Sequence, residues 1–410
     1  MANVSSQQER YAVASRANVP PFHVMDLLAA AEERSRSHGD VLNLVAGQPT
    51  TPAPSPVREE AVRLLRSGAT LGYTVASGIT ALREAIAGHQ RRLHGLAVGP
   101  EDVVVTTGSS GGFLLAFLAA FEAGDRVAMA RPGYPCYRNV LQALGCDVVE
   151  IDTGPETRYQ PTVAQLERAC ADHALRGGDL RGLIVASPAN PTGTMLLPGE
   201  LASLARWCED RGVQLISDEI YHGIEYAPLD GHPPLARSAW STSREAIVFG
   251  SASKYFSMTG WRIGWMLVPA RLRRAVDVLS GNFTICPPAL AQHAAVAAFS
   301  EASYAELDGH VRRYARNRAI LLDRLPGLGL RGLAPADGAF YVYADVGHLT
   351  DDALSFTRRL LAETGVAITP GIDFDTAQGR RFVRFSFAGT SEDVSEAVDR
   401  LAAWPGLVGG

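Results

Sequence analysis

Apolar residues along the chain follow two spacings, which predict helices and strands. Apolar residues that recur every three or four positions predict helices over 23–37, 57–66, 81–93, 111–121, 139–145 and 200–212. Short apolar runs that end at glycine, proline or acidic residues predict strands over 41–47, 101–108, 125–135, 146–152, 182–191, 213–219, 246–254 and 261–268. From about residue 80 onward, the predicted helices and strands alternate.

This alternation predicts an α/β fold with a mostly parallel sheet, because each pair of parallel strands needs a crossover helix between them. Helices would then cover both faces of the sheet. Ligands of such sheets bind beyond the carboxyl ends of the strands. Polar clusters follow several of the predicted strands, so we expect a binding site there.

The pattern changes after about residue 290. A long helical region reaches Leu325, and strands over 338–346 and 381–388 alternate with helices over 351–364 and 391–404. This is an α+β arrangement. We therefore predict a large domain over 49–290 and a smaller α+β domain formed by 1–48 together with 291–410.

Composition and charge narrow the function classes. The 410 residues carry a net charge of −5, so no basic surface for nucleic acid is expected. No apolar run approaches the roughly 20 residues of a membrane helix, and the N-terminus lacks a secretory signal pattern. Five scattered cysteines without CxxC spacing are typical of a reducing cytoplasm, and the histidines show no metal-ligand spacing. We expect a cytoplasmic protein without a metal, membrane or nucleic-acid partner.

Lys254 is the only lysine in the chain, and every other basic side chain apart from histidine is arginine. A coding bias toward arginine would produce the same composition. However, lysine can lose its proton and attack a carbonyl, whereas arginine stays protonated. The segment 249–265 (FGSASKYFSMTGWRIGW) adds serines and Arg262, which together can hold a phosphate. These residues point to a phosphorylated carbonyl cofactor; the alternative is a lysine on a solvated loop.

Three further segments follow predicted strands. In 213–223 (VQLISDEIYHG), Asp218 could hold a proton on a pyridine nitrogen and Tyr221 could bind a ring hydroxyl, although an acidic pair there could also bind metal or cap a helix. In 185–193 (VASPANPTG), Asn190 could donate to the same oxygen, although an Asn-Pro pair often marks only a turn. The glycine-rich 105–112 (VTTGSSGG) suits phosphate but matches neither GK[ST] nor GxGxxG.

With these motifs in this order, the chain from about residue 40 to its end resembles the fold type I aminotransferases of classes I and II. The resemblance implies pyridoxal 5'-phosphate as cofactor and transfer of an amino group between an L-amino acid and a 2-oxo acid, in amino-acid metabolism or biosynthesis. It implies that Lys254 holds the cofactor as a Schiff base and moves the substrate's alpha proton. It further implies that Asp218 pairs with the pyridine nitrogen and that Tyr221 and Asn190 contact the ring oxygen.

The resemblance also assigns the remaining residues. Tyr134 matches the aromatic residue that stacks on the ring. Arg384, in RFSFA, matches the arginine that binds the substrate carboxylate, with Gly47 and Asn190 beside it. Tyr73 matches a tyrosine that reaches the neighbouring subunit, which implies a homodimer with shared active sites. The implied phosphate contacts come from Ser109, Ser110, Ser251 and Arg262.

Other functions share these residues. Decarboxylases, lyases and ring-forming synthases of amino-acid or secondary metabolism use the same scaffold. A transcriptional regulator with an aminotransferase-like sensor domain is the remote alternative, but only about 40 residues precede the first core strand and the chain is acidic. We expect 19–22 and 281–288 to border the pocket for the substrate side chain, and their apolar character favours neutral or aromatic amino acids over dicarboxylates.

Overall fold

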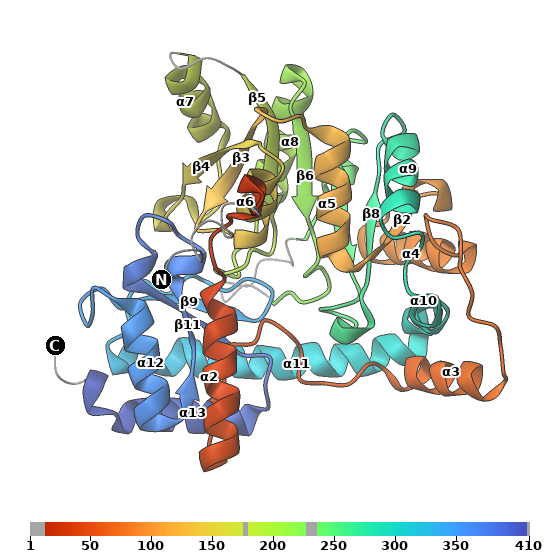
Figure 1. Ribbon diagram of the computed structural model, residues 1–410. Helices are drawn as coiled ribbons and strands as arrows, with labels where there is room; N and C mark the ends of the chain where they lie inside the picture. Colours follow the sequence, from red (N-terminus) through yellow and green to blue (C-terminus); the bar gives the residue numbers. More distant parts are fainter. Residues whose placement is uncertain (1–12, 175–178, 227–235, 408–410) are drawn as a thin grey trace, which may run out of the picture.

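The computed structural model describes residues 13–174, 179–226 and 236–407, and its centre is a seven-stranded sheet (Figure 1). Five neighbouring strands are parallel, which confirms the predicted α/β class. In spatial order the strands are β2 (Val103–Thr107), β8 (Ile263–Leu267), β7 (Ile247–Ser251), β6 (Gln214–Asp218), β5 (Leu180–Ala186), β3 (Arg126–Arg131) and β4 (Asp147–Asp152).

β8 runs antiparallel to both of its neighbours, β2 and β7. Only residues 252–262 connect β7 to β8, and this is too short for a crossover helix, so the chain returns antiparallel. This short connection contains Lys254.

Alternate residues of the central strands enter two separate cores. Leu215 of β6 and Val248 of β7 pack in one core, and their neighbours Ile216 and Phe249 pack in the other. Each strand is therefore buried on both faces, as the continuous apolar runs predict. One face is covered by α4 (Thr80–His94), α8 (Pro198–Arg211) and α10 (Ala289–Ala295), and the other by α5 (Gly108–Ala120), α6 (Pro135–Ala143) and α9 (Arg273–Phe283).

α9 is a helix that the apolar spacing did not predict. α7 (Val163–Ala174) provides the crossover between β4 and β5, and α3 (Ser55–Arg66) packs against α10. α11 (Glu301–Arg324) passes along the lower side of the molecule, from the helices beside β8 to the C-terminal strands (Figure 1).

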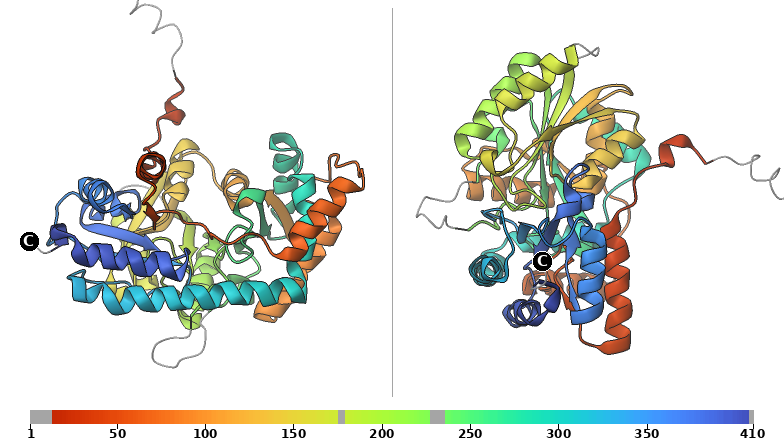
Figure 2. Two further views of the ribbon diagram at one scale, coloured as in Figure 1. Left: turned by 90° about the horizontal axis from the view of Figure 1, so that it is seen from below. Right: turned by 90° about the vertical axis from the view of Figure 1, so that its left-hand side faces the viewer.

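The C-terminal part contains two small sheets. In the first, β9 (Tyr341–Asp345) and β11 (Thr369–Pro370) flank β12 (Phe382–Ser386), and all pairs are antiparallel. In the second, β1 (Leu42–Asn43) pairs in parallel with β10 (Val366–Ala367). β1 is shorter than the strand predicted over 41–47. The helices α2 (His23–His38), α12 (Ala353–Thr364) and α13 (Ser391–Ala403) cover these sheets (Figure 2).

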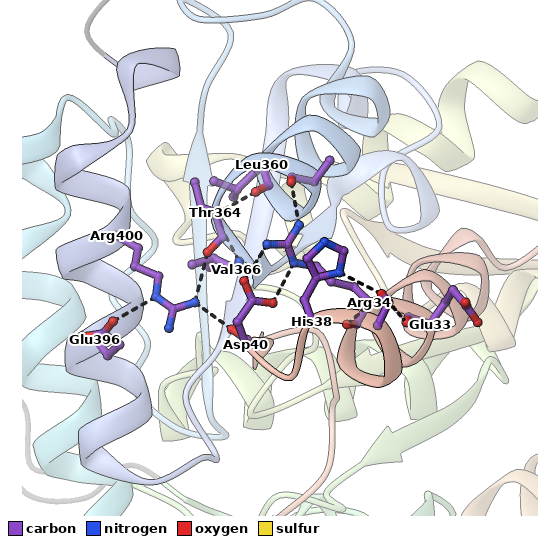
Figure 3. A network of polar contacts seen from close by, with 11 residues as sticks. Glu33, Arg34, His38, Asp40, Leu360, Thr364, Val366, Glu396 and Arg400 are labelled. Carbon is purple, nitrogen blue, oxygen red and sulfur yellow. Dashed lines mark hydrogen bonds and ion pairs between the residues drawn. The ribbon is translucent and has the colours of Figure 1, made fainter.

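A polar network joins the N-terminal helix to the C-terminal part (Figure 3). Arg34 of α2 makes two hydrogen bonds to the Asp40 carboxylate, at 2.9 and 2.6 Å. Arg400 of α13 donates to the carbonyl oxygens of Asp40 (2.7 Å) and Thr364 (3.1 Å). These bonds support our proposal that 1–48 and 291–410 form one small domain, of which residues 1–12 lie outside the described part of the chain.

Within the described residues, no helix is both long and apolar enough to cross a membrane.

Candidate active site

A cavity of about 680 Å³ lies at the carboxyl ends of β5, β6 and β7, between the large sheet and the N- and C-terminal segments. Most of the site residues expected from the sequence line it. They are Gly47, Ser109, Ser110, Tyr134, Asn190, Asp218, Tyr221, Lys254, Arg262 and Arg384.

Lys254 lies in a compact turn after β7. The backbone N–H of Met258 donates to the carbonyl of Ala252 at 2.9 Å, which closes the turn around the lysine. Lys254 Nζ donates to the carbonyl of Gly47 at 2.6 Å. Burial lowers the pKa of Lys254 to about 8, and the nearby positive charge of Arg384 acts in the same direction. A pKa of about 8 leaves roughly one-tenth of this amine uncharged at pH 7, far more than for an ordinary lysine, and this fraction can act as a nucleophile or base.

Asp218 is the last residue of β6 and is buried. Its carboxylate accepts hydrogen bonds from the Tyr137 hydroxyl and from the backbone N–H of Ile220 at 3.2 Å. Burial raises the pKa of Asp218 to about 6, while the bond from Tyr137 opposes this shift. A buried acid of this kind is suited to pair with a cationic ring nitrogen.

The hydroxyl groups of Tyr221 and Tyr341 are 2.7 Å apart. Burial raises the pKa of Tyr221 well above its ordinary value, so its hydroxyl stays protonated and can donate. Gly47 lies against the same pair, since a Cβ added there would be 2.6 Å from the Tyr341 hydroxyl oxygen. Glycine is therefore required at this position by close packing.

Arg384 is a buried cation, with 2% of its surface exposed. Its guanidinium donates to Asn190 Oδ1 and to the carbonyl of Val45, both at 2.7 Å, and stacks over Tyr341 at 4.4 Å. Its Nε has no hydrogen-bond partner, and none of the ion pairs found among the described residues includes it. A buried guanidinium without a carboxylate partner is suited to bind an anion.

The N-terminus of α5 forms the other end of the cavity. Backbone N–H groups at a helix N-terminus attract phosphate, and the hydroxyls of Ser109 and Ser110 lie there with Arg262. Gly108 has φ +68°, and a Cβ added to it would be 2.2 Å from Arg262 Nη2. Glycine therefore allows the guanidinium to approach the helix end. The hydrogen-bond donors at this end fit a phosphate. Asp218 fits a protonated pyridine nitrogen, and Lys254 fits a carbonyl group. Pyridoxal phosphate contains all three groups.

Two of the predicted site residues are not among those that line this cavity. Ser251 is buried and does not line the cavity, because its hydroxyl turns toward its own loop and accepts a bond from the Ser253 N–H at 3.1 Å. Ser253 lines the cavity in its place. Tyr73 is 84% exposed and is not among the residues that line the cavity of its own chain.

Sequence reasoning missed two tyrosines, Tyr137 and Tyr341, that contact Asp218 and Tyr221. Tyr137 follows the predicted Tyr134 by three residues in the segment RPGYPCY, which was the available signal, whereas no motif marks Tyr341. Of the segments expected near the substrate side chain, Phe22 lines the cavity, but 281–288 does not. Tyr134 lines the cavity and packs edge-on against Tyr137 with ring centres 5.4 Å apart.

Known proteins match the chain over almost its whole length. Residues 39–401 match the family described as "Aminotransferase class I and II". The valine–pyruvate aminotransferase of Mycobacterium tuberculosis is 59% identical over 392 residues, which cover 96% of this chain and 98% of that protein. The aspartate/prephenate aminotransferase of Thermus thermophilus is 36% identical over 384 residues, which cover 93% of this chain and 95% of that protein.

Solved structures agree. An aminotransferase from Mycobacterium tuberculosis matches with a TM-score of 0.91 at 59% identity, over 96% of this chain and 99% of the other. The aspartate aminotransferase of Thermus thermophilus with maleate matches with a TM-score of 0.87 at 34% identity, over 96% of this chain and 99% of the other.

The fold and the site thus define a fold type I enzyme that uses pyridoxal phosphate. The chain belongs to the family of class I and II aminotransferases, and it is a pyridoxal-phosphate-dependent aminotransferase. The predicted fold class, cofactor and activity are confirmed.

Proposed function

We propose that this aminotransferase moves the amino group of a neutral, apolar L-amino acid to a small 2-oxo acid, with Lys254 as the group that carries the proton. When bound, pyridoxal phosphate supplies a carbonyl that combines with amines and a protonated ring that withdraws electrons from the substrate's alpha carbon. The protein positions these groups and moves the proton.

Each cavity residue has a defined part in this proposal. The uncharged Nζ of Lys254 takes the proton from the substrate's alpha carbon and would deliver it to the carbonyl carbon of the cofactor. The Asp218 carboxylate holds a proton on the ring nitrogen, and the Tyr221 hydroxyl donates to the ring oxygen. The hydroxyls of Ser109 and Ser110 and the Arg262 guanidinium bind the phosphate, so the ring is held at both ends.

Arg384 binds the substrate's alpha-carboxylate. The observation that carries this assignment is the buried guanidinium with an unpartnered Nε, in a cavity that also contains the only lysine of the chain. Asn190 and the carbonyl of Val45 hold the guanidinium in place before substrate arrives. A fixed cation binds a carboxylate without having to give up rotamer freedom first.

The preference for a neutral donor follows from the charges of the cavity. Its lining contains three cations, Lys254, Arg262 and Arg384, and each already has a role. Near the N-terminal segment the lining is instead apolar, formed by Phe22, Val24, Met25 and Leu28. A second carboxylate would lose its water there without gaining a partner. The 59% identical relative is named for valine and pyruvate, which supports the same substrate class.

The test is a half-reaction with single amino acids. The enzyme with bound pyridoxal phosphate is mixed with valine, leucine, alanine, phenylalanine, aspartate or glutamate, without any 2-oxo acid, and the visible absorbance is followed. We expect the neutral amino acids to bleach the enzyme and leave it in the pyridoxamine form. Because an unpaired buried carboxylate costs about 2–3 kcal/mol, aspartate should react roughly 30- to 150-fold more slowly at equal concentration. A faster reaction with aspartate than with every neutral amino acid would contradict the proposed donor.

We also infer a cytoplasmic homodimer with shared active sites. Tyr73 and Val75 are exposed, and Thr74 between them is bonded through its N–H to Cys286 Sγ at 3.4 Å. The adjacent Phe283 and Ile285 are also exposed, at 56% and 48%. An exposed apolar patch of this kind is typical of a subunit interface. All five cysteines are free thiols, which suits a reducing compartment.

A further inference from the structure

Three side chains of types that can bind metals, His94, Glu219 and His222, lie close together. His94 is the last residue of α4, and Glu219 and His222 lie in the turn that follows β6. His222 Nδ1 is 3.1 Å from His94 Nε2 and 3.4 Å from Glu219 Oε2. One ligand atom from each residue lies within 4.8 Å of the other two.

These distances match the spacing of ligands around a small divalent ion. Zinc binds histidine nitrogen and carboxylate oxygen at about 2.0–2.2 Å, so neighbouring ligand atoms of a tetrahedral site are about 3.3–3.5 Å apart. The two shortest separations in this cluster are close to that range. An ion can therefore contact all three atoms with only small side-chain movements.

The surrounding contacts fix the carboxylate in a suitable position. Glu219 Oε1 accepts hydrogen bonds from the Ser217 hydroxyl at 2.8 Å and from the Ala239 N–H at 2.7 Å. These bonds leave Oε2 to face His222. Hydrogen bonds to a ligand carboxylate of this kind hold its orientation in known metal sites.

Burial keeps the cluster largely away from solvent. Glu219 and His222 are buried, with 5% and 7% of their surface exposed, and His94 is partly buried. Two imidazoles and one carboxylate are a common ligand set for divalent ions such as zinc.

We propose that His94, Glu219 and His222 bind one divalent ion of the zinc class, with water as the fourth ligand. Glu219 follows Asp218 directly, and His222 follows Tyr221 directly. The ion would hold α4 against the turn that carries both cofactor contacts. Sequence spacing gave no sign of this site and led us to expect no metal, because His94 is 128 positions from His222.

The test measures metal binding directly and does not rely on activity. The enzyme with bound pyridoxal phosphate is treated with a chelator, passed through a desalting column and titrated with Zn²⁺ in a calorimeter. Metal content is then measured after a second column. We expect one tightly bound zinc per chain in the wild type, and loss of that zinc in His94→Gln and His222→Gln. Co²⁺ in place of Zn²⁺ should give visible absorption bands typical of a tetrahedral site.

A matched control is His38→Gln, since His38 is an exposed histidine of α2 outside the cluster, bonded only to its neighbour Ser37. It should bind zinc like the wild type. The absorbance of the bound cofactor reports whether each variant is folded. If His222→Gln loses the cofactor, the His94→Gln variant decides the result, because His94 is only partly buried. The proposal is overturned if the wild type retains no zinc, or if His94→Gln retains as much zinc as the wild type.

Discussion

Asn190 Oδ1 accepts a hydrogen bond from Arg384 Nη1 at 2.7 Å. Because the oxygen of this side-chain amide is occupied, its NH₂ group is the part left to bind a cofactor or substrate oxygen. The same bond holds the guanidinium in position. The two residues lie 194 positions apart in the chain, in different parts of the fold, so this contact joins the end of β5 to β12 at the substrate end of the cavity.

Replacement of Arg384 should remove the binding of the substrate carboxylate. Two charge-assisted hydrogen bonds are worth about 1.5–3 kcal/mol each, so Arg384→Gln should lower kcat/KM for valine by at least ~100-fold. Steady-state kinetics measure the effect. Arg380→Gln serves as the control, because Arg380 is exposed and bonded to the carbonyl of Asp351. An Arg384→Gln enzyme with unchanged kcat/KM would remove Arg384 from the proposed site.

The pH dependence of cofactor uptake should report the lowered pKa of Lys254. The protonated amine is not a nucleophile, and burial places its pKa at about 8. The rate at which apoenzyme reacts with pyridoxal phosphate should therefore rise with pH around a midpoint of about 8, instead of the ordinary 10.5. Stopped-flow absorbance measures this profile.

The Arg384→Gln variant provides a check on the cause of this shift. The positive charge of Arg384 helps to lower the pKa of Lys254, so its removal should move the midpoint to higher pH. A wild-type midpoint near 10, or a move to lower pH in the variant, is the result that contradicts this account.

Gly47→Ala should disturb the site through packing. The added Cβ would be 2.6 Å from the Tyr341 hydroxyl oxygen, so the ring must move and its bond to Tyr221 must lengthen or break. Overpacking of this size costs about 1–3 kcal/mol of unfolding free energy. The denaturant concentration at the midpoint of unfolding and kcat should therefore both be lower than in the wild type.

Gly199→Ala is the matched control for Gly47→Ala. Gly199 lies in α8, and a Cβ added there meets nothing within 4 Å. Alanine is favoured over glycine in a helix, so this variant should keep full activity and unfold no more easily than the wild type. Equal effects of the two substitutions would mean that the contact with Tyr341 is unimportant.

The sequence was sufficient to predict the side of the sheet where the site lies. Asp218 ends β6, and Lys254 follows β7 by three residues. Since parallel strands end at the same edge, their positions along the chain already place the two side chains near each other. The order of motifs then identified the family.

The sequence was not sufficient to predict which side chains face the cavity, because tertiary packing determines this. Every residue of β7 is buried, so the pattern of polar and apolar residues does not show that Ser253, two residues after the strand, lines the cavity. Tyr341 comes from the small sheet and reaches Tyr221 only because the two parts of the fold close on each other. Helix α9 was also missed.

Tyr73 offers the sharpest test of the shared active site, because it is 84% exposed in its own chain and does not line its own cavity. If Tyr73 binds the partner's phosphate, Tyr73→Ala should weaken cofactor affinity by ~10- to 100-fold, as expected for one hydrogen bond to a charged group. In a mixture with Lys254→Ala chains, each hybrid dimer then contains one site with a native Lys254 and a native Tyr73. Random exchange should restore about a quarter of wild-type activity at limiting cofactor. If Tyr73 served its own chain, no hybrid site would be intact and no activity would return, while light scattering confirms that the dimers have formed.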